Sequence, residues 1–148
     1  MIKRIIGPLL AVSLLLAAAT SALAQEERSY TEGPVTQVSS LKILPGMFDT
    51  YMKYLATTYK GLMEEYKKSG LIVDYGVYAT NARNPSEPDL YLTITYKNWA
   101  ALDGLQDRMD PISSKVWGSR SGADKASVDR GKMREQLGVE YIQKLNLK

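Results

Sequence analysis

The strongest periodic pattern in the sequence covers residues 47–68. Apolar and aromatic side chains recur there every three or four residues and fall within an arc of about 120° on a helix. They are Phe48, Tyr51, Met52, Leu55, Tyr59, Leu62, Met63 and Tyr66. The opposite side carries charged pairs such as Asp49 with Lys53, at the spacing of exposed ion pairs. Gly70 follows at a C-terminal cap position, so the pattern predicts one long amphipathic helix.

Segments typical of β-strands lie on both sides of this helix. Residues 35–43 alternate loosely between apolar and polar side chains and stop at Pro45-Gly46. Residues 71–80 and 90–96 are rich in β-branched and aromatic side chains, and a polar loop with prolines, 81–89, separates them. These two segments predict a β-hairpin, and residues 139–147 predict a last strand.

The region between the hairpin and the last strand predicts several helices. Asn98 is a helix cap for a segment in which Trp99, Leu102, Leu105 and Met109 share a side. Asp110-Pro111 predicts a fresh cap with proline at the first helical position. Residues 118–122 predict an interruption, and 123–137 return to a helical pattern that Gly138 closes. The second helical region is therefore expected to be broken into two or more helices.

The predicted order is β-α-β-β-α-β, which is the ferredoxin-like α+β arrangement with an antiparallel sheet. Its helices are expected to cover one sheet face, formed by Leu41, Ile43, Val73, Val77, Leu92, Ile94, Leu145 and Leu147. The other face is expected to carry Ser40, Lys42, Ile72, Asp74, Tyr78, Tyr91, Thr93, Thr95, Ile142 and Lys144. That second face is too aromatic for a solvated surface and too polar for an ordinary core. A cavity shared between two sheets suits the mixture.

The first 24 residues resemble a secretory signal peptide. Lys3 and Arg4 precede an apolar run, and small residues stand at the −3 and −1 positions of a cleavage site after Ala24. The alternative is an uncleaved membrane anchor, but the apolar run is short against the roughly 20 residues that a bilayer span needs. We expect a periplasmic or secreted protein with a signal at 1–24, a flexible lead at 25–34 and one domain at 35–148.

Composition excludes several classes of function. Lys3 and Arg4 account for much of the formal net charge of +3, so the chain after Ala24 is nearly neutral, and neither nucleic-acid binding nor membrane attachment is expected. The sequence contains no Cys and no His. Disulfides, Ser/His/Asp and Cys/His catalysis and haem ligation by histidine are therefore excluded. No acidic cluster has the spacing of a calcium loop, and the glycines form no phosphate loop, so we expect no metal and no cofactor.

The segment from Lys42 to Gly46 before the long helix, the Tyr- and Thr-rich hairpin and the late helix before a terminal strand resemble the dimeric α+β barrel superfamily. The antibiotic-biosynthesis-monooxygenase-like branch is the most similar. The resemblance covers residues 35–148 and implies two ferredoxin-like subunits packed sheet to sheet. It also implies a small organic ligand, bound in the barrel between the subunits or in the cleft under the helices. The sequence departs from the histidine-using members of the superfamily.

Candidate site residues follow from the alternation of side chains along the strands. Lys42, Asp74, Tyr78, Tyr91 and Thr93 are placed on the sheet face without helices. If that face lines a cavity, Asp74 is a candidate base with a raised pKa, the tyrosines donate hydrogen bonds and Lys42 binds an anion. The alternative is that Lys42 and Asp74 form an interface ion pair while the tyrosines fill a dimer core.

Arg130 is the unusual residue of the last predicted helix, because it shares a face with Ala126, Met133 and Leu137. Its guanidinium is a candidate to bind a ligand carboxylate under the helix. The alternative is that its stem lies on apolar surface with the head in water. Trp99 and Trp117 have two interpretations in the same way, as packing residues or as stacking platforms.

Three functions remain open from the sequence. The first is a non-catalytic, secreted homodimeric barrel that binds a small, partly apolar organic molecule. The second is a cofactor-independent enzyme of the monooxygenase or isomerase type that acts on an aromatic or polyketide-like compound, with tyrosines and one carboxylate moving protons. The third is a monomer whose exposed sheet recruits another protein. The missing histidine favours the first of these.

Overall fold

A computed structural model describes residues 28–148, and the predicted signal at 1–24 lies outside the described residues. The helices are α1 Phe48–Tyr54, the wide turn η1 Leu55–Tyr59, α2 Lys60–Lys68, the short η2 Trp99–Leu102, α3 Leu105–Trp117 and α4 Arg120–Gly131. The strands are β1 Tyr30–Ile43, β2 Asp74–Ala79, β3 Leu90–Tyr96 and β4 Arg134–Leu147. Between residues 28 and 148, no helix combines the length and the apolar character that a membrane span requires.

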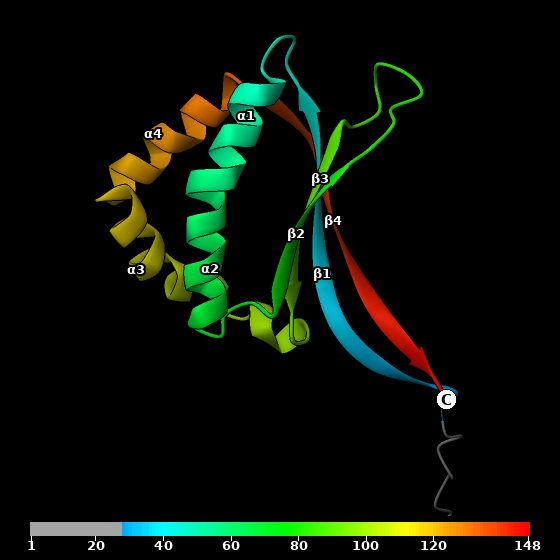
Figure 1. Ribbon diagram of the computed structural model, residues 1–148. Helices are drawn as coiled ribbons and strands as arrows, with labels where there is room; N and C mark the ends of the chain where they lie inside the picture. The colour runs from blue at the N-terminus through cyan, green and yellow to red at the C-terminus, as the bar shows by residue number, and fades with distance from the viewer. Residues whose placement is uncertain (1–27) are drawn as a thin grey trace, which may run out of the picture.

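The four strands form one antiparallel sheet in the order β2-β3-β1-β4. Helices α1 to α4 all lie on one side of this sheet, and the opposite face is bare (Figure 1). The ribbon of β1 and β4 extends well past the end of β2 and β3 (Figure 1). The ferredoxin-like α+β fold with an antiparallel sheet and a broken second helical region is confirmed.

The long helix predicted at 47–68 forms as one continuous column, α1-η1-α2 (Figure 1). Its middle is a π-turn, in which the amide of Lys60 donates to the carbonyl of Leu55, five residues earlier. Thr57 supports this turn by donating its hydroxyl to the carbonyl of Lys53 at 2.8 Å. A π-turn widens a helix locally and is common at functional sites.

The hairpin strand β2 begins at Asp74, later than the predicted residue 71, and this changes two assignments. Gly70 ends the helix with a φ of 74°, and the amide of Leu71 turns back to the carbonyl of Tyr66. Ile72 therefore lies outside the strand and is buried against the helix, whereas it was expected on the bare face. Val73, expected on the covered face, is exposed.

The core lies between the long helix and the covered face of the sheet, in two clusters. One cluster joins Leu41 and Leu90 of the sheet to Tyr51 and Leu55 of the helix. The second consists of Met63, Tyr66, Ile72 and Tyr96. Leu41 and Tyr51 are almost completely excluded from solvent, and truncating such a side chain typically costs about 2–5 kcal/mol.

The first and the last strand, β1 and β4, both differ from their predicted bounds. β1 begins at Tyr30, so the end of the predicted lead belongs to the sheet. β4 begins at Arg134, inside the segment predicted as a helix over 123–137, and α4 stops at Gly131. The reason is pairing: residues 134–136 bond to β1, and this tertiary contact overrides local helix propensity. Gly138 is not a helix cap but sits beside a β-bulge.

The helical region after the hairpin follows the prediction in part. The Asn98 side chain accepts a hydrogen bond from the amide of Ala101, as expected for a cap. The fresh start predicted at Asp110-Pro111 is wrong, because Pro111 lies inside α3. The break comes later, at Gly118, whose φ of 74° favours glycine, and Ser119 caps α4 by accepting from the amide of Gly122.

The corner between α3 and α4 is too tight for a side chain at Gly122. A Cβ at this position clashes with the carbonyl oxygen of Trp117, whereas a Cβ at Gly131, in the same helix, meets nothing within 4 Å. We expect Gly122→Ala to lower the free energy of unfolding by about 1–3 kcal/mol. We expect Gly131→Ala to leave it unchanged or raise it slightly. Urea denaturation measures both, and equal effects of the two substitutions would contradict the tight corner.

Candidate functional site

The bare sheet face brings together three of the sequence-predicted site residues. Tyr78 pairs across the strands with Tyr91, and Thr93 pairs with Gly76. Any Cβ on Gly76 would collide with the Tyr78 ring and the Thr93 hydroxyl, so the ring lies over the glycine next to Thr93. Tyr91 and Thr93 are half-buried, and Tyr78 is 56% exposed. In the single chain this group is an open surface.

Lys42 and Asp74 bind other partners and do not pair with each other. The Lys42 Nζ donates to Asp89 Oδ1 at 2.9 Å, and the other Asp89 oxygen accepts from the backbone amide of Ile43 at 2.8 Å. Asp74 accepts from Lys67 of α2 at 2.9 Å in an exposed ion pair. The hydrogen bond from Lys67 lowers the pKa of Asp74, the direction opposite to that expected of a general base.

Arg130 reaches a cavity of about 360 Å³ on the covered side of the sheet, between the long helix, α3, α4 and the strands. Its polar lining consists of Gln37, Tyr51, Tyr54, Tyr59, Tyr66, Gln106, Ser113, Arg130 and Arg134. Its apolar lining consists of Leu62, Met63, Leu92, Ile94, Trp117 and Ala123. Trp117, which is part of this lining, is the last residue of α3. The cavity therefore combines aromatic and aliphatic walls with many hydrogen-bonding groups.

The tyrosines reach the cavity because they repeat along one side of the long helix. Tyr51 and Tyr54 precede the π-turn, Tyr59 ends it and Tyr66 follows in α2. The rings of Tyr51 and Tyr54 stack with their centroids 5.8 Å apart. Tyr59 meets the edge of Tyr75 at 6.0 Å. Neighbouring aromatic rings at these distances stabilise one another, which holds the wall in place.

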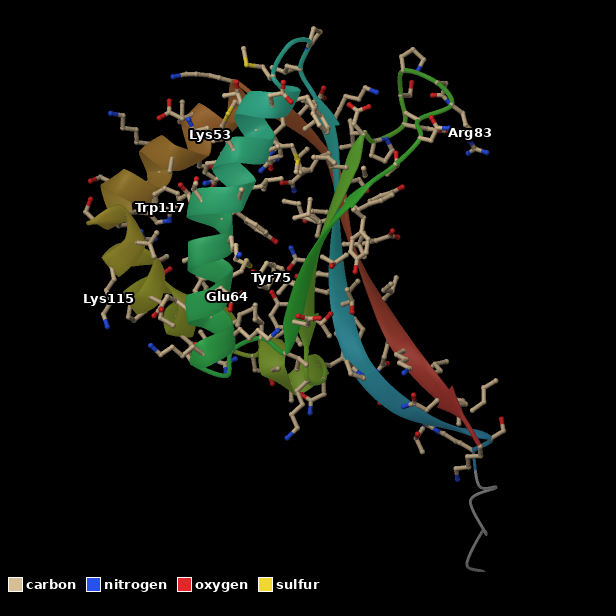
Figure 2. All side chains as sticks on the ribbon, viewed as in Figure 1. Lys53, Glu64, Tyr75, Arg83, Lys115 and Trp117 are labelled. Carbon is tan, nitrogen blue, oxygen red and sulfur yellow. The ribbon has the colours of Figure 1, made fainter. Side chains whose placement is uncertain are left out.

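Tyr75 shows how the wall is fixed at the edge of the sheet. Its hydroxyl donates to Glu64 Oε1 of α2 at 2.6 Å, and Figure 2 shows the two residues facing each other across the space between β2 and α2. The hydrogen bond to the Glu64 carboxylate raises the pKa of Tyr75 to about 12. The Tyr75 hydroxyl therefore has a hydrogen-bond partner, whereas the Tyr59 hydroxyl has none among the described residues.

Two residues that line the cavity each have a buried polar atom without a hydrogen-bond partner among the described residues. These atoms are the hydroxyl oxygen of Tyr59 and the Nε of Arg134. Burial raises the pKa of Tyr59 far above its ordinary value, so the phenol remains protonated and is a hydrogen-bond donor. Buried polar atoms are almost always paired in folded proteins. Two unpaired ones on residues that line the same cavity mark it as a candidate binding site.

The two arginines contact the tyrosine pair. Arg130 Nη1 of α4 donates to the hydroxyl of Tyr54 at 3.3 Å. Arg134, the first residue of β4, lies beside Tyr51, where its positive charge partly offsets the rise that burial gives to the pKa of Tyr51. Arg134 Nη1 also donates to Gln136 at 3.1 Å. Arg130 is a candidate from the sequence, and it lines the cavity with its guanidinium on the hydroxyl of Tyr54.

Sequence reasoning missed Arg134 and the helix tyrosines. Arg134 lies within a segment predicted as a helix. Tyr51, Tyr59 and Tyr66 belong to the predicted amphipathic stripe, and Tyr54 does not. The available signal was chemical, because each tyrosine of a buried stripe carries a hydroxyl that needs a partner. Trp99, by contrast, lies at the sheet edge, where its Nε1 donates to Gln143 at 3.0 Å.

The fold and this cavity define the chain as a ferredoxin-like α+β protein with a tyrosine- and arginine-lined cleft under its helices. No known protein family matches the sequence, and no curated protein sequence matches it. Among solved structures, HapK from Hahella chejuensis is similar in fold, with a TM-score of 0.51 and 12% identity over 74% of this chain and 91% of HapK. Protein SO0527 from Shewanella oneidensis has a TM-score of 0.49 and 14% identity over 79% of this chain and 96% of its own.

No group of three or more acidic side chains gathers in a geometry for a metal ion anywhere in residues 28–148. The chemistry that the cavity offers is hydrogen bonding from phenols and amides, positive charge from arginine, and apolar contact.

Burial of the tyrosines gives a testable pH dependence. Burial raises the pKa of Tyr96 from an ordinary 10 to about 12, and it shifts the pKa values of Tyr51, Tyr59 and Tyr66 in the same direction. Above pH 10 the unfolded chain releases phenolic protons that the folded chain retains. We therefore expect full stability below pH 10 and a progressive loss toward pH 12, measured by urea denaturation at each pH. The loss is expected to be smaller in Tyr96→Phe, and a flat profile would contradict the burial.

Proposed function

We propose that the cavity between the helices and the sheet binds a small, partly apolar organic molecule. The observation that carries the proposal is that two residues lining this cavity, Tyr59 and Arg134, each have a buried polar atom, Oη and Nε, without a partner among the described residues. Leaving a buried donor unpaired costs about 1–3 kcal/mol. A ligand with suitable acceptors recovers that free energy when it binds.

The size and lining of the cavity support the same proposal. Its volume of about 360 Å³ lies within the range of roughly 300–1,000 Å³ that is usual for small-molecule sites. Leu62, Leu92 and Ile94 offer apolar contact, and the phenols offer hydrogen bonds for orientation. Most ligand sites combine apolar walls with a few well-placed polar groups in this way.

We further propose that two copies of the chain assemble through the bare sheet face. This face carries exposed Tyr78 and Ile142, and on β4 Glu140 and Lys144 stand two residues to either side of Ile142. A two-fold axis near Ile142 brings Glu140 of one subunit toward Lys144 of the partner subunit, as a self-complementary interface requires. The ferredoxin-like fold and the resemblance to dimeric α+β barrels support this assembly.

We also propose that the chain is exported and cleaved after Ala24.

The binding proposal predicts opposite effects of Tyr59→Phe on stability and affinity. Removing an unpaired buried hydroxyl is expected to leave the free energy of unfolding unchanged or to raise it by about 1 kcal/mol. The same change is expected to weaken the binding of naphthalene-2-carboxamide, a neutral aromatic probe with a carbonyl acceptor, by about tenfold. In a Trp99→Phe background, Trp117 is the remaining tryptophan, and its fluorescence reports binding in the cavity.

Tyr78→Phe is the matched control, because Tyr78 lies on the opposite sheet face. The Tyr78→Phe protein should bind the probe with the same affinity as the wild type. Native mass spectrometry of the protein purified from its own host tests the same proposal without a chosen probe. An empty cavity by mass spectrometry together with no probe binding would contradict the proposed function.

The dimer proposal predicts that Ile142→Lys shifts the protein toward a monomer. Ile142 is 53% exposed in the single chain, so the substitution is expected to leave the folded subunit intact while it introduces like charges at the two-fold axis. Val128→Lys, at a position on α4 that is 64% exposed, is the control. Sedimentation velocity measures both. A wild-type protein that sediments as one subunit at high concentration would overturn the proposed assembly.

A further inference from the structure

The cavity has a positive charge that no lining side chain offsets. Arg130 and Arg134 both line it, and none of the other described lining residues is an aspartate or a glutamate. The remaining polar lining consists of phenols, amides and one serine hydroxyl, which are neutral. Isolated charges beside a partly buried space are unfavourable unless an opposite charge accompanies them.

Neither arginine forms an ion pair with another described residue. The ion pairs of residues 28–148 involve Arg28, Lys42, Lys67, Arg83 and Lys132. Asp129 is adjacent to Arg130 in sequence, but its carboxylate binds Lys132 at 2.7 Å. Residues 28–148 thus supply counter-ions to several surface cations and none to the two arginines of the cavity.

The two guanidinium groups approach the same part of the cavity wall. Arg130 donates to the hydroxyl of Tyr54, and Arg134 lies beside Tyr51. The Tyr51 and Tyr54 rings are stacked at 5.8 Å with an interplanar angle of 14°, so the two phenols stand side by side. The two positive charges therefore converge on one short stretch of wall, while Tyr59 lies further along the helix, at the end of η1.

We propose that the molecule bound in this cavity is an aromatic carboxylate, whose anionic group is held by Arg130 and Arg134. The proposal rests on the proposed binding function of the same cavity. The unpartnered Nε of Arg134 is one of the donors that a guanidinium presents to a carboxylate in a two-point contact. The ring of the ligand lies against Leu62, Leu92 and Ile94, and Tyr59 donates to a second oxygen of the ligand.

The choice of carboxylate over a larger anion follows from the size and the walls of the cavity. A space of about 360 Å³ with aliphatic and aromatic sides accommodates a small ring system and leaves polar contacts at the arginine end and at Tyr59. The planar fork of arginine matches a planar carboxylate. The molecule therefore needs one charged end and a flat apolar body.

The test compares naphthalene-2-carboxylate with naphthalene-2-carboxamide, which have the same shape and differ in charge. Titration calorimetry of the wild-type protein at pH 7 is expected to show at least about tenfold tighter binding of the carboxylate. Arg134→Gln and Arg130→Gln are each expected to weaken binding of the carboxylate about tenfold. Each is expected to change the affinity for the carboxamide by less than about twofold. Unchanged carboxamide binding also shows that each variant is folded.

Arg83→Gln is the matched control, because it removes the same charge from the loop between β2 and β3, far from the helices (Figure 2). It should not change the affinity for either probe. Equal binding of the two probes by the wild type would overturn the carboxylate inference and leave the binding function standing. Failure of both probes at millimolar concentration, with no retained mass in the native protein, would overturn both proposals.

Discussion

The pairing of β1 with two neighbours is the constraint on which the rest of the structure depends. β1 bonds to β3 along one edge and to β4 along the other, and Val35 and Leu41 on its covered side have no exposed surface. Asp89 ties the end of this strand by accepting from the Ile43 amide and from Lys42. Because side chains alternate along a strand, this register decides which residues meet the helices and which remain on the bare face.

The cavity exists because the covering helices are built with tyrosines and because α3 and α4 do not close the space over the strands. α3 packs on α2 and α4, and α4 contacts β4 only near the start of β4 (Figure 1). Gln37 of β1 provides a polar floor, since its side-chain oxygen accepts from Tyr96 at 3.4 Å and from Tyr141 at 3.1 Å. An aliphatic stripe in place of the tyrosines would remove the phenol hydroxyls from the helix side of the cavity and leave fewer polar groups to orient a ligand.

Local patterns predicted most of the fold, and long-range pairing explains what they missed. The long helix and the second hairpin strand have strong patterns in their own residues and form where the pattern placed them, whereas the first hairpin strand begins three residues later than predicted. The segment from Arg134 was assigned to a helix because its local propensity favours one, but β1 offers a strand partner that no local pattern contains. Because local patterns do not contain this pairing, Arg130 of α4 was predicted as a candidate site residue, whereas Arg134 at the start of β4 was not. The cavity depends on how α4 ends and β4 begins, and only the folded chain shows this.

The two proposed surfaces lie on opposite sides of one sheet, and β3 connects them. Leu92 and Ile94 face the cavity, while Tyr91 and Thr93, their neighbours in the chain, lie on the bare face. Each side chain therefore serves one surface, and a substitution on the bare face can change assembly without touching the ligand wall. The cavity wall in turn keeps Tyr59 Oη and Arg134 Nε unpaired at a cost in stability. Because an apolar or internally paired wall would be more stable, the proposed ligand would account for two groups that folding alone does not explain.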